Sequence, residues 1–264
     1  MSDRIIVEVS AGVADVRLAR PDKHNGLDRP MFEALISTGE QLATDRSLRA
    51  VVLSGEGRSF CAGLDFASFM MSPQVLEAML ARNEKSPANF AQRAAWVWTE
   101  LPVPVIAALH GNVLGGGLQL AAAADIRFAT PDARLSIREI EWGLVPDMSG
   151  TQTLRHLVRL DVFKELAFTG RIVDGREALE LGLVTRITDD PLRAARDLAR
   201  EIASKSPDAI RGIKRLSNTA VNATVSEGLL LEEQVQRTVL GRRNQLEAVA
   251  ANMGKRPPRF VDPE

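Results

Sequence analysis

The chain has 264 residues, enough to bury a large core as one domain or as a domain with an appendage. Its residues are 45% hydrophobic and 25% charged, and the formal net charge is −1, so nothing general favours binding to nucleic acid or to an anionic membrane. No apolar run approaches the roughly 20 residues that span a bilayer.

The cysteine and histidine content points to a protein of a reducing compartment that holds no metal. A single cysteine, Cys61, excludes an internal disulfide, and the first residues lack the apolar segment of a signal peptide. We therefore expect a cytoplasmic location. The histidines show no spacing typical of metal ligands; they are His24, His110 and His156.

The first hundred residues alternate between strand and helix patterns. The expected elements, in chain order, are a hairpin of two strands (4–10 and 13–18), a loop (20–26), a helix capped by Asp28, a strand (50–54) and a helical stretch broken near Ser86-Pro87 (73–101). The helix after Asp28 has Pro30 in its first turn and an apolar face that includes Met31, Leu35 and Leu42.

Two glycine loops each follow a predicted buried strand. The loop RSFCAGLD at 58–65 follows the strand at 50–54, and the segment GNVLGGGLQLAAAAD at 111–125 follows an apolar strand at 103–110. The glycines at 115–117 let a backbone or a ligand approach closely, and the alanines behind them favour a helix. Free N–H groups at such a turn suit an oxyanion or a phosphate. A plain strand-to-helix turn is the other interpretation.

Other glycine signatures do not fit the second segment. A dinucleotide fingerprint needs Gly-x-Gly-x-x-Gly, whereas these glycines are at 111, 115, 116 and 117. The Gly-Lys-Ser/Thr of a P-loop and the Gly-x-Ser-x-Gly of a nucleophile elbow do not occur in it. A backbone site for an oxyanion remains.

The second half of the chain is predicted to be mainly helical. The expected elements are a strand (126–129), helices (149–160, 162–168 and from Asp174 to about Gly182), a strand (184–187) and helices after Pro191 with a break at Ser206-Pro207. Apolar residues of the last helices favour packing against the core or another subunit: Ile210, Ile213, Leu216, Leu229, Leu230, Val235 and Val239. A composition shift divides the chain into a core at 1–200 and a helical portion at 201–264.

Together with the segment IREIEWGLVPD at 137–147, the two glycine loops resemble the crotonase superfamily, the enoyl-CoA hydratase/isomerase group. The resemblance extends over nearly the whole chain. It implies an α/β fold with a β/α spiral core, and a helical carboxy-terminal portion that forms trimers or dimers of trimers. It also implies an acyl-CoA substrate and no separate cofactor. One backbone N–H from each loop would hold the thioester carbonyl, here those of Leu64 and Gly116.

An enolate formed at such a site needs an acid or a base nearby. Glu139 and Glu141 would share one face of a strand. The resemblance places Glu139 at a catalytic glutamate position and leaves Glu141 as a solvated or structural residue. Hydratases of the family carry a second glutamate where this chain has Gln119. A neutral amide cannot take a proton; it either orients water or is simply a polar residue of the first helical turn.

Asp147 is a candidate for the second carboxyl. Its position resembles an aspartate of dienoyl-CoA isomerases, and also the nucleophile of a dehalogenase branch that lacks an equivalent of Glu139. A helix cap before Ser149 is the other interpretation.

The resemblance also assigns CoA-binding positions besides Leu64 and Gly116: Lys23, Ala62, Asp65, Lys255 and Phe260. We therefore expect an enzyme that most readily isomerises the double bond of an enoyl- or dienoyl-CoA. Hydration of a 2-enoyl-CoA is the alternative, and an acyl-CoA-binding protein without activity is a third possibility.

Overall fold

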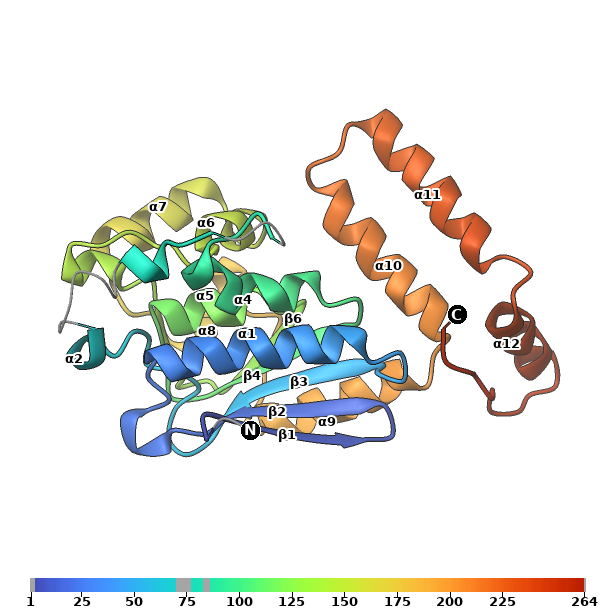
Figure 1. Cartoon of the computed structure of the whole chain (residues 1–264), viewed down its shortest axis with the longest axis horizontal. Coiled ribbons are helices and arrows are strands. Elements are labelled where there is room, and N and C mark those ends of the chain that lie inside the picture. Colours follow the sequence, from blue (N-terminus) through green and yellow to red (C-terminus); the bar gives the residue numbers. More distant parts are fainter. Residues whose placement is uncertain (1–2, 70–76, 83–85, 264) are drawn as a thin grey trace.

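The computed structural model describes residues 3–69, 77–82 and 86–263. At its centre is a six-stranded sheet in the order β1-β2-β3-β4-β6-β8, in which β1 and β2 pair antiparallel and the later neighbours pair parallel (Figure 1). The strands are β1 (Ile5–Ser10), β2 (Val13–Leu18), β3 (Ala50–Gly55), β4 (Val105–Leu109), β6 (Ile126–Ala129) and β8 (Arg186–Ile187).

Helices cover both faces of this sheet. Alternate side chains of a strand point to opposite faces. Val51 and Leu53 of β3 therefore join the main core with α1 (Arg29–Thr44), α4 (Phe90–Glu100) and α5 (Gly116–Ala122), while Ala50 and Val52 pack against α9 (Pro191–Ala203). The other helices are α2 (Phe66–Phe69), α6 (Gly150–Thr153), α7 (Leu160–Thr169), α8 (Gly175–Leu181), α10 (Pro207–Ala220), α11 (Val225–Val239), α12 (Arg243–Met253) and the 3-10 helices η1 (Pro21–Lys23), η2 (Glu139–Trp142) and η3 (Leu154–His156).

A second, smaller sheet gives the core its spiral character. It contains β5 (Asn112–Leu114) paired in parallel with β7 (Arg134–Ser136), and Cys61 forms a parallel bridge to Val113. The chain thus passes three times from the large sheet to the small one: from β3 to Cys61, from β4 to β5, and from β6 to β7. The small strands were not predicted, because three-residue segments carry too little periodicity.

Most predicted boundaries agree with the structure to within a few residues. Asp28 and Asp174 cap their helices as expected, by accepting from the backbone N–H of Met31 and Glu177. The single helix predicted at 149–160 is wrong. The chain forms α6 and η3 there, and Arg159 is extended (φ −60°, ψ 149°), so α7 starts afresh after it. Of the stretch at 73–101, residues 73–76 and 83–85 lie outside the described part.

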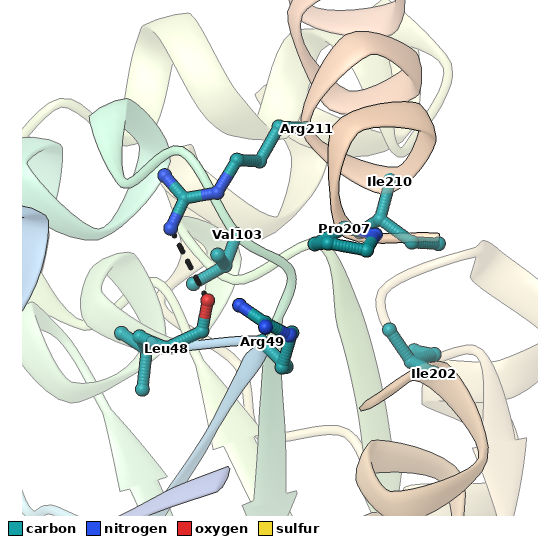
Figure 2. A pocket seen from close by; sticks show the side chains of 7 residues that line it. All are labelled: Leu48, Arg49, Val103, Ile202, Pro207, Ile210 and Arg211. Carbon is teal, nitrogen blue, oxygen red and sulfur yellow. Dashed lines mark hydrogen bonds between the residues drawn. The ribbon is translucent and has the colours of Figure 1, made fainter. Parts of the chain in front are cut away.

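Polar side chains of α10 connect the carboxy-terminal helices to the core by hydrogen bonds. Figure 2 shows a small pocket at this junction, where Arg211 Nη2 donates to the Leu48 carbonyl oxygen at 3.2 Å. One turn further on, Lys214 Nζ lies 2.7 Å from Asp125 Oδ2. The pocket is lined by two arginines, Arg49 and Arg211, and by no carboxyl, imidazole or thiol, so it is no candidate for acid–base chemistry.

Beyond this junction the chain is helical, as predicted, although its division at residue 200 stays a prediction. Of the helices that the structure describes, none has the length and apolar character needed to cross a membrane.

Candidate active site

Three predicted site residues meet at one edge of the small sheet. Leu64, Gly116 and Glu139 follow within three residues of Cys61, β5 and β7 respectively. The carboxyl ends of parallel strands lie at the same edge of a sheet. The loops are tied there, because Leu114 N donates to Cys61 O at 3.0 Å and Gly115 N donates to Ser136 O at 2.9 Å.

The N–H of Leu64 is free to bind a ligand. Leu27 pairs in parallel with Leu64: Leu27 N donates to Gly63 O at 2.8 Å, and Asp65 N donates to Leu27 O at 3.0 Å. In this pattern the N–H of Leu64 itself points to the side opposite Leu27. Among the described residues no acceptor bonds to it.

The N–H of Gly116 likewise has no acceptor in the part of the chain that the structure describes, and its loop contacts the loop of Leu64. Gly116 is the first residue of α5, where N–H groups have no intrahelical partner. The preceding Gly115 has φ 51° and ψ −120°, a conformation that requires glycine. A Cβ at Gly63 would lie 2.6 Å from Leu114 O and 3.5 Å from Gly116 N. The two glycine loops therefore bring together two free N–H donors, an arrangement suited to an oxyanion.

Glu139 is the buried carboxyl of the site. Its Oε1 accepts from Gln119 Nε2 at 2.5 Å, while its Oε2 is buried without a hydrogen-bond partner in the described part of the chain. A Cβ on Gly115 would lie 3.4 Å from Oε1, so the carboxyl lies against the second glycine loop. Burial raises the pKa of Glu139, and the Gln119 hydrogen bond acts in the opposite direction.

The predicted strand at Arg138–Glu141 is wrong, and with it the shared face of Glu139 and Glu141. The segment forms the 3-10 helix η2, in which about three residues complete a turn, so residues two apart point in different directions. Glu139 is buried and Glu141 is exposed.

Gln119 connects Glu139 to the segment that follows Asp147. Its Oε1 accepts from Met148 N at 2.8 Å and from Gly150 N at 2.9 Å, and its Nε2 donates to Glu139. The amide oxygen therefore has no capacity left to accept from a water molecule. The oxygen of Gln119 is thus not available to orient water, and the residue lies in the first turn of α5, where it bonds to other parts of the protein.

Asp147 acts electrostatically on Glu139, and it also lies on a groove whose lining residues include neither Leu64, Gly116 nor Glu139. The groove has a volume of about 1360 Å³ and is bounded by α4, α5, α6 and α10. Burial of part of its carboxyl raises the pKa of Asp147, and its charge contributes to the raised pKa of Glu139, although solvent still reaches the residue. The helix-cap interpretation is wrong, because Ser149 precedes α6 and no side chain caps this helix.

The remaining CoA-binding predictions fall into two groups. Ala62 N donates to His24 O at 2.9 Å, so Ala62 lies beside the early loop, where Lys23 is exposed; the Asp65 carboxylate is paired with Arg20 at 2.8 Å. The exposed Lys255 and the half-buried Phe260 follow α12, which lies at the opposite end of the long axis from α2 (Figure 1). A single chain therefore does not bring Lys255 and Phe260 to Leu64.

Two features beside the site were not predicted from the sequence. Phe66 stacks on Trp142 with ring centroids 4.0 Å apart, which links the residues after Leu64 to the turn that carries Glu139. Their closeness in sequence to Leu64 and Glu139 was the available signal. Cys61 is no nucleophile, because its buried thiol donates to Asn25 O and burial raises its pKa to about 12.

A mixed six-stranded sheet and a small parallel sheet form the spiral, and beside its buried carboxyl lie two N–H groups with no acceptor among the described residues. This arrangement defines an enzyme of the crotonase fold. The family model "Enoyl-CoA hydratase/isomerase" matches residues 8–263. A crystal structure of enoyl-CoA hydratase from Bacillus anthracis superposes with a TM-score of 0.90 at 30% identity, covering 97% of this chain and 98% of that one. The chain belongs to the enoyl-CoA hydratase/isomerase family, as the sequence predicted.

Curated relatives of similar identity have different activities. The mouse mitochondrial Delta(3,5)-Delta(2,4)-dienoyl-CoA isomerase is 34% identical, with 94% of this chain and 79% of that protein covered. The human mitochondrial methylglutaconyl-CoA hydratase is 32% identical, with 97% of this chain and 76% of that protein covered. Family membership therefore leaves the reaction open, and the cytoplasmic location stays a prediction.

Proposed function

We propose that this protein isomerises the carbon–carbon double bond of an enoyl- or dienoyl-CoA thioester, with no cofactor besides the CoA of the substrate. The observation that carries the proposal is the set of groups around Glu139. One buried carboxyl has a free oxygen, a second carboxyl lies within electrostatic range at Asp147, and position 119 holds a neutral amide. Moving a proton along a chain needs a carboxyl that takes the proton and returns it.

The proposed reaction begins with the thioester carbonyl oxygen accepting hydrogen bonds from the N–H groups of Leu64 and Gly116. Oε2 of Glu139 takes a proton from the α-carbon, and the electron pair of that C–H bond delocalises onto the carbonyl oxygen as a dienolate. The proton is then returned to a carbon further along the chain by Glu139, or is delivered by a protonated Asp147 that regains a proton from Glu139 before the next cycle. As the electrons return from oxygen, the double bond forms next to the carbonyl, with no net gain or loss of atoms.

Hydration of a 2-enoyl-CoA is the second candidate. The similarity to methylglutaconyl-CoA hydratase favours it. Water addition needs one group to activate water and another to deliver the α-proton, so Asp147 would have to take the part that the amide of Gln119 cannot. A pure acyl-CoA-binding protein has no need of two carboxyls here, which argues against the third possibility.

We expect double-bond migration in a 3-enoyl- or 3,5-dienoyl-CoA to be faster than hydration of crotonyl-CoA by the same preparation. Both reactions can be followed by ultraviolet absorbance with product identification by mass spectrometry. Asp147→Asn should slow isomerisation if the two carboxyls act together, whereas Asp132→Asn at an exposed turn serves as the control. Efficient hydration of crotonyl-CoA without detectable isomerisation would refute the preferred reaction.

We also expect assembly into trimers or dimers of trimers. Large apolar side chains are exposed along the carboxy-terminal helices and their connections: Ile213, Leu229, Leu230, Leu240, Leu246 and Met253. Extensive exposed apolar surface marks an interaction site. Light scattering at micromolar concentration tests this, and a stable monomer would contradict it. Leu229→Asp should weaken assembly, while Val9→Asp, at an exposed position on β1, should not.

Such an assembly would allow Lys255 and Phe260 of one copy to approach the CoA bound to another. Binding of CoA by these residues is part of the proposal.

A further inference from the structure

Gln119 makes three hydrogen bonds within the protein through its side-chain amide. Only 1% of its surface is exposed, and its amide bonds to Glu139 Oε1 and to two backbone N–H groups, those of Met148 and Gly150. A polar residue that merely ended a helical turn would not need partners in two separate loops.

The surroundings permit one orientation of this amide. If it were turned over, its NH₂ group would face the N–H donors of Met148 and Gly150, and its oxygen would face the carboxylate of Glu139. Two glycines leave space for the side chains of Gln119 and Glu139. A Cβ on Gly150 would lie 2.6 Å from Gln119 Oε1, and a Cβ on Gly115 would lie 3.4 Å from Glu139 Oε1.

We propose that Gln119 is a positioning residue that holds Oε1 of Glu139 and leaves Oε2 as the atom that transfers the proton. The same amide fixes the backbone next to Asp147, so one side chain sets the geometry of both carboxyls. This inference rests on the proposed function, because it takes Glu139 as the base. Oε2 is the buried oxygen of this carboxyl that has no partner among the described residues.

The titration of Glu139 is a measure of this role. Among the described residues, the charge of Asp147 acts on Glu139 through space and raises its pKa. The thiol of Cys61, on the neighbouring loop, stays neutral because burial raises its pKa to about 12. The hydrogen bond from Gln119 favours the charged carboxylate, so its loss should make Glu139 titrate at higher pH.

The experiment compares Gln119→Met, Gln119→Glu and the control Gln41→Met, at an exposed position of α1. The Glu139 carboxyl is titrated by NMR in ¹³C-glutamate-labelled protein, with Glu139→Gln identifying its signal, and kcat and KM are measured against pH. In Gln119→Met we expect titration at higher pH and a roughly tenfold lower kcat at neutral pH, with KM less affected. The control should match the wild type in both measurements.

Gln119→Glu keeps an acceptor for Met148 N and Gly150 N, so it tests the role even if Gln119→Met does not fold. Its carboxyl can donate to Glu139 only while protonated. We therefore expect an additional loss of kcat as the pH rises, which a merely structural role would not produce. Unchanged titration of Glu139 in folded Gln119→Met, or a wild-type pH profile in Gln119→Glu, would overturn the inference. The titration uses no substrate, so a wild-type protein that fails to isomerise enoyl-CoA would count against the proposed function alone.

Discussion

Glu139→Gln is expected to lower isomerase turnover by about 10³-fold or more. Loss of a general base typically lowers the rate by about 10²–10⁴-fold. The introduced amide has nearly the same shape and still offers an oxygen to Gln119 Nε2, so the local structure should be kept. It cannot take the α-proton. Turnover of a 3-enoyl-CoA is measured under saturating substrate, and Glu141→Gln is the matched control, because Glu141 is two residues away and exposed.

The pH dependence of the wild type should accompany this loss. As a base, Glu139 must be ionised, and burial together with the charge of Asp147 raises its pKa. The rate should therefore rise with pH through the pKa of Glu139, and fall on acidification at a higher pH than an ordinary glutamate would give. Removal of a buried carboxyl should not lower the melting temperature. Turnover above a tenth of the wild-type value in a folded Glu139→Gln variant would exclude Glu139 as the base.

The parts of the site that the sequence predicted are those that depend on local backbone chemistry. Gly63 and the glycines at 115–117 stand after apolar runs, and in the structure they make the close approach between two loops. Asp28 and Asp174 also act locally, since a helix cap bonds a residue three positions on. In these cases the residues that determine the turn or the helix start lie within a few positions of it in the sequence.

The parts that the sequence did not predict depend on distant partners. The hydrogen-bond partners of Gln119 are at positions 139, 148 and 150. These positions come later in the chain, where it is again at the same edge of the small sheet. Glu139 was expected on a strand, where it would share a face with Glu141, yet the chain turns there into η2. In the proposed assembly, Lys255 and Phe260 reach the CoA bound to a second copy of the chain, which one sequence cannot place. At Gln119 and Glu139, tertiary contacts rather than the local sequence pattern determined the structure.

Gly116→Val is expected to lower turnover by about 10²–10³-fold, the loss found when one donor of an oxyanion hole is removed. A Cβ at this position would lie 2.7 Å from Met148 Sδ and 2.9 Å from Leu27 Cδ1. Both side chains are buried, so relieving these contacts shifts either the start of α5 or the ends of the Leu27 and Met148 side chains. A shift at the start of α5 moves the Gly116 donor itself.

The Gly116→Val measurement needs a control for the general effect of a β-branched residue. Gly228→Val provides it, because a Cβ at Gly228 meets no atom within 4 Å. Circular dichroism and thermal unfolding establish that both variants fold, and kcat/KM for the isomerisation is then compared with the wild type. We expect kcat to fall in Gly116→Val, because a donor to the oxyanion stabilises the transition state more than the bound thioester. Full activity in folded Gly116→Val would show that the N–H of Gly116 does not hold the thioester oxygen.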